Sequence, residues 1–319
     1  MSKLPSTPPF ESLPLKRDGP PGNAWGLYGE NNQLGMLIRL TPENTIEAAK
    51  SITHGIRISL DLAMDQPKFP YFQRAIFHQE INSKAPRTVN DDILTFNTQS
   101  STQWDGFRHY GYQEEKVFFN GVTQEQVHNT LTHGIDVWAE NGGIVGRGVL
   151  LDYGAWAQSQ GLSLDMFSST KIPLSDILKV AEAQHVTFKP GDILFIRSGY
   201  TKALTGLTTA EAEELSKRPL PIQAIGVEAC KETLKWMWDT EFAAVAGDML
   251  SFESYPLSGP YMMHQWALAG WGLPLGELFD LERLASECKR LDKWDFFFSS
   301  VPLKVPGGVA SPPCSVAIL

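Results

Sequence analysis

Short apolar runs alternate with segments of helical periodicity between residues 146 and 250. The runs over 146–153, 189–197 and 242–247 are typical of buried strands, and a Lys-Pro-Gly-Asp turn leads into the second of them. Apolar residues three and four positions apart predict helices over 175–184 and 228–240. This alternation of strand and helix indicates an α/β domain.

Elements on either side of this region extend the pattern. Thr41 followed by Pro42 predicts a helix that begins at Pro42, with Thr41 as its N-cap. Alternating residues over 57–62 predict a strand. We expect further helices over 209–217, where the exposed face is acidic, and over 281–291.

The chain divides into an arm and one domain. Residues 1–24 are rich in Pro and Gly, so we expect an arm that lies over the surface or over a neighbouring subunit. A frayed tail is the alternative for residues 1–12. Because no linker or repeat interrupts residues 25–319, we interpret them as a single domain.

Composition narrows the classes of partner and compartment. The chain has 319 residues, 42% of them hydrophobic, and a net charge of −9, which argues against nucleic acid and anionic membranes as partners. The 3 cysteines are too few and too widely spaced for a disulfide framework or a zinc finger. The first residues lack the apolar run of a signal peptide, so we expect a cytoplasmic protein.

The segment from Gln99 to His109 has the most unusual polar pattern of the chain. Gln99, Ser101, Gln103 and Asp105 are two residues apart, and His109 has the same parity. Side chains of one parity share a face of an extended strand, so one face would carry two amides, a hydroxyl, a carboxylate and an imidazole. Such a set is costly to bury in an apolar core, which favours an active-site strand. A structural histidine and an Asp-Gly turn are the alternatives.

Two further polar groups follow apolar segments. Asp248 and Ser251 come after the predicted strand 242–247, at the strand end where α/β sheets usually keep their sites. Helix capping explains them equally well. His264 and Glu277 are separated by a helical start and a Gly/Pro break, so only the tertiary fold can bring them together.

Aromatic residues near these segments are candidates for a substrate pocket. Trp25, Trp104 and Tyr110 would suit a planar molecule, and core packing is the alternative for each of them. Cys230 lies among apolar neighbours in a predicted helix, so we expect a core residue rather than a nucleophile.

Taken in order, several segments resemble the cyclase family, which includes bacterial kynurenine formamidase and isatin hydrolase. The family motif His-x-Gly-Thr-His-x-Asp-x-Pro-x-His falls on residues 99–109. Thr102, Asp105 and His109 match it, whereas Gln99 and Gln103 stand in place of its two earlier histidines. The positions that the family fills with Gly and Pro are Ser101 and Phe107. The segments 25–35, 192–200, 226–251 and 302–312 also resemble the family, so the resemblance runs from about residue 25 to the end.

This resemblance implies a swivelling β/α/β domain with a mixed sheet and a barrel-like core, assembled as a homodimer or homotetramer with the arm at the interface. It also implies a divalent metal (Mn, Zn or Mg) held by Asp105, Gln103, His264 and Glu277, with His109 as the general acid/base. An amide oxygen is a weaker ligand than imidazole, so a site without metal is equally open. Gln99 and Gln103 are then polar partners of Asp105 or of the substrate.

Three functions follow. The first is a hydrolase that cleaves an amide, lactam, ester or lactone bond of a small cyclic or aromatic molecule, using His109 and a metal-activated water. The second is a metal-independent cyclase, dehydratase or lactonising enzyme of secondary metabolism, with His109 and Asp105 or Glu277 as the acid/base pair. The third is a small-molecule binding protein that has lost its metal centre. In each case we expect the partner to be a small molecule.

Overall fold

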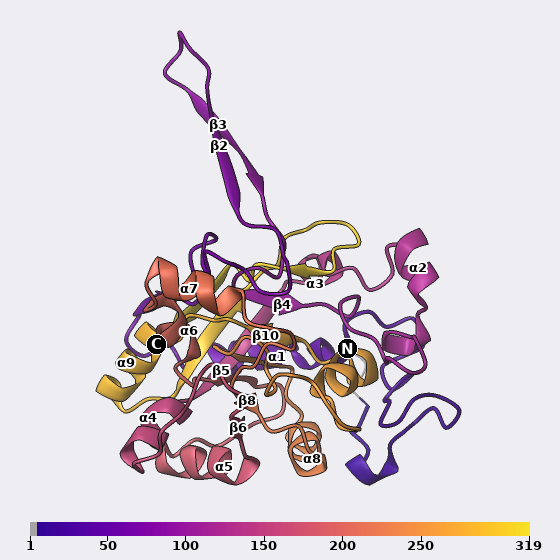
Figure 1. The fold of residues 1–319 in the computed structure, drawn as a ribbon. Helices are drawn as coiled ribbons and strands as arrows, with labels where there is room; N and C mark the ends of the chain where they lie inside the picture. The colour runs from indigo at the N-terminus through magenta and orange to yellow at the C-terminus, as the bar shows by residue number, and fades with distance from the viewer. Residues whose placement is uncertain (1–4) are drawn as a thin grey trace.

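A nine-stranded mixed sheet forms the centre of the protein. The computed structural model describes residues 5–319 (Figure 1). The strand order is β1-β13-β11-β5-β7-β9-β10-β4-β12, and the sheet curls into a half-barrel. The strands are β1 (Arg57–Ser59), β4 (Gln103–Asp105), β5 (Ile144–Leu151), β7 (Ile193–Ile196), β9 (Ala244–Gly247), β10 (Leu275–Glu277), β11 (Asp295–Ser300), β12 (Ala310–Ser311) and β13 (Ser315–Ile318). Strands β5, β7, β9 and β10 run parallel, and β4 pairs antiparallel with β10.

Helices occupy the segments between the strands, close to their predicted places. They are α1 (Pro42–Ala49), α2 (Gln124–Asn129), α3 (Asp136–Glu140), α4 (Tyr153–Ser159), α5 (Leu174–Ala183), α6 (Tyr200–Thr205), α7 (Thr209–Ser216), α8 (Lys231–Asp239), α9 (Glu282–Leu291), the short turns η1 (Phe10–Ser12), η2 (Gly35–Arg39) and η3 (Phe119–Gly121), and the π-helix η4 (Gln265–Trp271). Helix α1 has the predicted cap, because the Thr41 hydroxyl accepts the backbone N–H of Asn44. The predicted α/β class is therefore confirmed. Among residues 5–319, no helix combines the length and apolar character needed to cross a membrane.

Aromatic rings fill the space inside the curled sheet. Phe195 on β7 lies 4.9 Å from Phe298 and 5.5 Å from Phe279 between ring centroids. Trp104 on β4 packs against the same two rings and donates its indole N–H to the hydroxyl of Ser300. The strand that carries the candidate site is thus anchored by one of the largest side chains of the core.

Residues 5–24 lie over the body of their own chain. The Phe10 ring stacks on Trp266 with centroids 5.7 Å apart, and the indole N–H of Trp238 is donated to the carbonyl of Pro8. These contacts hold the segment on α8 and the π-helix. The alternative of a frayed tail over residues 1–12 does not fit Pro8 and Phe10, which contact the body. Residues 1–4 lie outside the described part of the chain.

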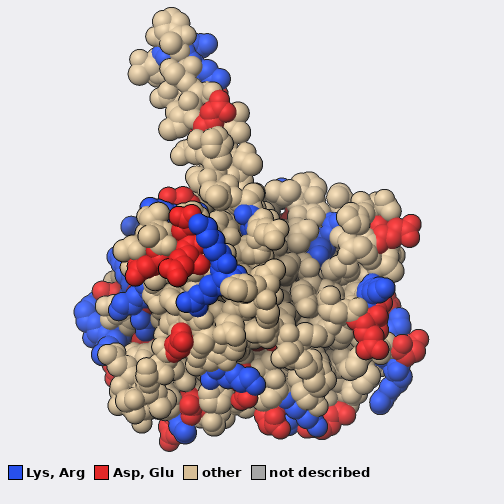
Figure 2. Space-filling model, viewed as in Figure 1, with Lys and Arg blue, Asp and Glu red and all other residues tan. Residues whose placement is uncertain are grey.

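A two-stranded hairpin projects far from the body (Figure 1). Strands β2 (His78–Ser83) and β3 (Asn90–Thr95) pair only with each other, and almost all of their residues are exposed. Ile81 and Leu94 share one face and are 68% and 47% exposed. Figure 2 shows basic side chains toward the tip and acidic ones lower on the shaft. The smaller pair β6 (Lys171–Ile172) and β8 (Gly226–Val227) lies on the main body.

Candidate active site

The floor of the candidate site is the antiparallel pair β4–β10. Gln103 lies directly opposite Glu277, and its amide N–H is donated to Oε2 of Glu277 at 2.7 Å. The two strands pack closely because Gly276 faces Trp104, where an added Cβ would come within 2.8 Å of the indole. Sequence parity thus places Gln103 and Asp105 on one face as predicted.

The predicted strand is shorter than expected, however. Only Gln103–Asp105 is extended, whereas residues 99–102 and 106–109 form turns. Gln99 reaches the site through the first turn and donates its amide N–H to Oδ1 of Asp105 at 2.7 Å. His109 arrives through the second turn, in which its backbone N–H is donated to the carbonyl of Gly106. Tertiary contacts, rather than strand parity, therefore bring Gln99 and His109 to Asp105.

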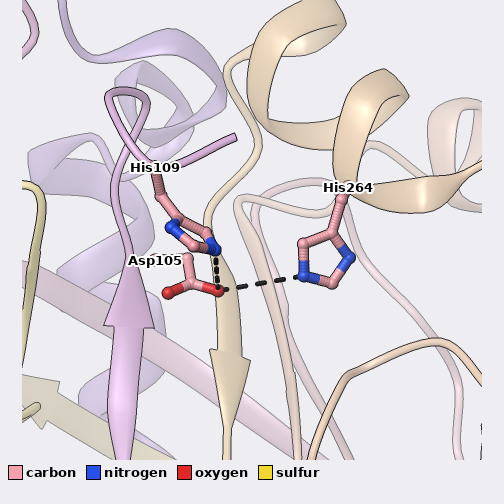
Figure 3. Close-up of side chains that lie close together, drawn as sticks. All are labelled: Asp105, His109 and His264. Carbon is pink, nitrogen blue, oxygen red and sulfur yellow. Dashed lines mark ion pairs between the residues drawn. The ribbon is translucent and has the colours of Figure 1, made fainter. Parts of the chain in front are cut away.

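His109 and His264 converge on one oxygen of Asp105 (Figure 3). The Nε2 atoms of His109 and His264 lie 3.8 and 4.0 Å from Oδ2 of Asp105. His264 enters from the start of the π-helix, which follows it directly. The fold thus brings together residues more than 150 positions apart in the sequence.

Glu253, which sequence reasoning did not select, holds His264 in place. Its carboxylate accepts Nδ1–H of His264 at 2.9 Å and the backbone N–H groups of Met263 and His264 at 2.8 Å each. Nε2 of His264 then points toward Glu277, whose Oε1 lies 3.3 Å away. The sequence signal that could have identified Glu253 is the polar stretch 247–253, in which Glu253 follows Ser251 by two residues.

Burial and charge set the protonation of the three central groups. Burial lowers the pKa of His264, but hydrogen bonds to Glu253 and Glu277 outweigh it and raise that pKa to about 10. Burial and the nearby Glu277 raise the pKa of Asp105 to about 7. Burial, together with the charges of His264 and Arg74, lowers the pKa of His109 to about 3, so this imidazole is neutral near pH 7.

A cavity of about 290 Å³ opens onto His109 and His264. Of the predicted site residues, His109, Tyr110, Ser251, His264 and Glu277 line it. The other six lining residues were not predicted; they are Phe72, Arg74, Leu250, Tyr255, Pro256 and Leu257. No sequence motif marks them, because they come from irregular segments that the fold places over the site.

Three predicted substrate contacts lie elsewhere, and each has a structural task. Trp104 packs in the core, as described above. The indole of Trp25 donates to the carbonyl of Ala269 at 2.7 Å, away from the cavity. Asp248 accepts the backbone N–H groups of Ser198 and Gly199 at 2.7 Å each, so it ties β9 to the loop after β7. The capping alternative does not describe these contacts, because Asp248 binds the loop after β7 and not the element that follows it in the chain.

The donor set fits a divalent cation. Oδ2 of Asp105 and Oε1 of Gln103 are buried and have no hydrogen-bond partner, which is costly unless a cation or ligand lies between them. Ligand atoms of Asp105, His109 and His264 all lie within 4.8 Å of one another. Glu277 is less available, because Oε1 accepts the N–H of Phe252 and Oε2 accepts that of Gln103. Mixed oxygen and nitrogen donors suit Mn²⁺ or Zn²⁺ better than Mg²⁺.

Comparisons with known proteins agree with this architecture. Residues 52–254 match the model of the putative cyclase family, and the chain belongs to that family. A crystal structure described as that of a novel cyclase has a TM-score of 0.82 at 27% identity, covering 93% of this chain and 99% of its own. No match was found among curated proteins.

Isatin hydrolases share the fold. Isatin hydrolase A from Labrenzia aggregata, bound to benzyl benzoate, has a TM-score of 0.60 at 16% identity, covering 87% of this chain and 98% of its own. An isatin hydrolase bound to the product analogue thioisatinate has a TM-score of 0.59 at 12% identity, covering 88% and 99%. The predicted cyclase-family fold is confirmed.

Proposed function

We propose that this protein is a hydrolase that opens an amide, lactam, ester or lactone bond of a small cyclic or aromatic molecule. The observation that carries the proposal is the convergence of His109 and His264, which both line the cavity, on the unpartnered oxygen of Asp105. Membership of the cyclase family and the shared fold with isatin hydrolases support this class of reaction.

His109 is the group that moves the proton. Its imidazole is neutral near pH 7, so a ring nitrogen is free to accept a proton from the attacking water and return it to the leaving group, although the low pKa makes it a weak base. Gln99 orients Asp105, and Glu253 keeps Nε2 of His264 directed into the site. One divalent cation, held by Asp105, His264 and Gln103, would supply a water molecule of lowered pKa.

A second function, metal-independent acid/base catalysis, has its own supporting observation. The amides of Gln99 and Gln103 donate hydrogen bonds to Asp105 and Glu277, and these amides occupy the two positions where the family motif has histidines. In this version His109 and Asp105 form the acid/base pair of a cyclisation, dehydration or lactonisation, and no cation takes part.

Turnover assays on protein purified without chelator separate these functions. The substrates would be isatin, an aryl lactone and an aryl formamide, and metal content would be measured by elemental mass spectrometry. For the hydrolase we expect chelation to reduce turnover and Mn²⁺ or Zn²⁺ to restore it. We also expect His109→Gln to lower kcat by roughly 10²- to 10⁴-fold.

The matched control is His128→Gln, because His128 is exposed on α2 and does not line the cavity. Turnover that survives chelation but is lost in His109→Gln would favour the metal-independent enzyme. Binding of these molecules without any bond cleavage would contradict the hydrolase and favour the binding protein.

A further inference from the structure

Arg74 is a half-buried cation in the cavity wall. Its Nη1–H group donates a hydrogen bond to the backbone carbonyl of Gln99 at 2.5 Å, and within residues 5–319 the Arg74 guanidinium forms no ion pair with a carboxylate. It lines the same cavity as His109 and His264. A guanidinium has five N–H donors in a planar fork, so most of its donors remain for a ligand.

The chain adopts an unfavourable conformation to bring Arg74 to this place. Phe72 and Gln73, the two residues before it, both have left-handed backbone angles, with φ of 60° and 56°. This conformation is rare for a bulky aromatic residue and persists where surrounding contacts impose it, often at functional sites. The Arg74 guanidinium then lies 4.9 Å from the centre of the Phe72 ring.

Aromatic rings surround the space in front of Arg74. Tyr255 packs edge-on against Phe72, with ring centroids 5.3 Å apart, and Tyr110 packs against His264 on the other side of the site. Since one face of the guanidinium is covered by Phe72, its edge is the part that can meet a ligand. An edge of N–H donors between aromatic walls matches a planar anion attached to an aromatic ring.

We propose that Arg74 binds a carboxylate on an aromatic substrate and so directs the scissile bond toward His109. This inference rests on the proposed function of the same site and adds the substrate class. The charge distribution supports it: the carboxylates of Asp105, Glu253 and Glu277 are all buried at the site. Without Arg74, these carboxylates would repel an anionic ligand.

The test compares two ligands of nearly equal shape by isothermal titration calorimetry. Benzoate carries the carboxylate, and benzamide is its neutral counterpart. We expect the wild-type protein to bind benzoate roughly 10- to 100-fold more tightly than benzamide, the range for a hydrogen-bonded charged group. Arg74→Gln should abolish this preference, and Arg74→Lys should retain part of it because the charge remains without the fork.

Arg218→Gln is the matched control. Arg218 lines a neighbouring groove together with Arg74 but does not line the cavity, so its loss should leave the preference unchanged. Thermal unfolding of each variant checks that the fold is intact. Equal binding of the two ligands, no binding of benzoate by the wild type, or a preference that survives in Arg74→Gln overturns the proposal.

This measurement is independent of turnover. His109→Gln should keep the preference for benzoate even where hydrolysis is lost, because binding and proton transfer use different residues. Failure of the hydrolase proposal therefore appears in the turnover assays, and failure of the carboxylate proposal appears in the calorimetry.

Discussion

Gln103 donates its amide N–H to Glu277 at 2.7 Å across a strand pair in which the two residues lie directly opposite each other. The cyclase motif has a histidine at this position. The amide leaves its own carbonyl oxygen buried and unpartnered, and it occupies one oxygen of Glu277. For the proposed cation, the exchange would therefore weaken two donors at once, the one at position 103 and the one at position 277.

Restoring the motif should strengthen metal binding. We expect the double variant Gln99→His and Gln103→His to bind Zn²⁺ roughly tenfold or more tightly than the wild type, because imidazole is the better donor. Calorimetric titration with Zn²⁺ measures this change. Gln158→His, which adds a histidine at an exposed position, is the control and should have no effect. An unchanged affinity in the double variant would show that the two positions do not face the cation.

The stability of the metal-free protein should depend on pH through His264. Its pKa in the folded protein, about 10, lies above its usual 6.5, because hydrogen bonds to Glu253 and Glu277 outweigh the effect of burial. A raised folded-state pKa gives stability that is complete below pH 6.5 and is lost as pH rises toward 10. We expect a loss on the order of 3 kcal/mol in the free energy of unfolding over this range.

Urea unfolding at pH 6 to 10, without added metal, measures this loss. Glu253→Gln removes one of the two carboxylate partners of His264, so its pH dependence should be smaller. Glu228→Gln, a substitution near the surface, is the control, and its unfolding free energy should have the same pH dependence as that of the wild type. A wild-type profile that is flat from pH 6.5 to 10 would contradict the charged state of His264.

Because β10 is closely packed, we predict that a methyl group added at position 276 destabilises the protein. A Cβ at position 276 would lie 2.6 Å from that of Ala246 and within 2.8 Å of the rings of Phe279 and Trp104. We expect Gly276→Ala to lower the free energy of unfolding by about 1 to 3 kcal/mol, the usual cost of overpacking. Adding Ala246→Gly removes one of the colliding methyl groups and should recover part of the loss. A neutral Gly276→Ala in urea unfolding would show that β4 and β10 can move apart.

The projecting hairpin bears on the predicted homodimer or homotetramer. A two-stranded ribbon is marginal by itself in water, and Ile81 and Leu94 expose aliphatic surface on one of its faces. We predict that this face contacts a second copy of the chain. Light scattering coupled to size exclusion should then show an oligomer for the wild type and monomers for Ile81→Lys with Leu94→Lys.

The control places the same substitution on the main body. Leu162→Lys with Leu178→Lys changes two exposed leucines there and should leave the oligomer intact. A monomeric wild type, or an oligomer that resists the hairpin substitutions, would contradict this prediction.

Much of the fold was predictable because local signals agreed with the tertiary structure. Thr41 caps its helix as expected, and the buried runs around Leu150, Phe195 and Val245 are the central parallel strands. The strand predicted over 99–109 was wrong in length, because turns before Gln103 and after Asp105 replace extended structure. Parity alone did not reveal these turns.

The candidate site was predictable where a motif marks it and unpredictable where only packing does. Asp105, His109, His264 and Glu277 meet as expected. Arg74, by contrast, reaches the cavity through a left-handed pair of residues that no propensity favours. Trp25 and Trp104 looked like pocket residues because aromatic rings serve cores and pockets alike, and only the three-dimensional contacts distinguish the two.

The position of Trp104 has a consequence for how this protein can evolve. Its two neighbours in sequence, Gln103 and Asp105, belong to the site, while Trp104 itself holds the core, so mutations on this strand act on folding and chemistry together. Phe72, Arg74 and Tyr255 lie in segments outside the central sheet. New substrates should therefore be acquired by changing this outer wall, while the catalytic floor is inherited with the fold.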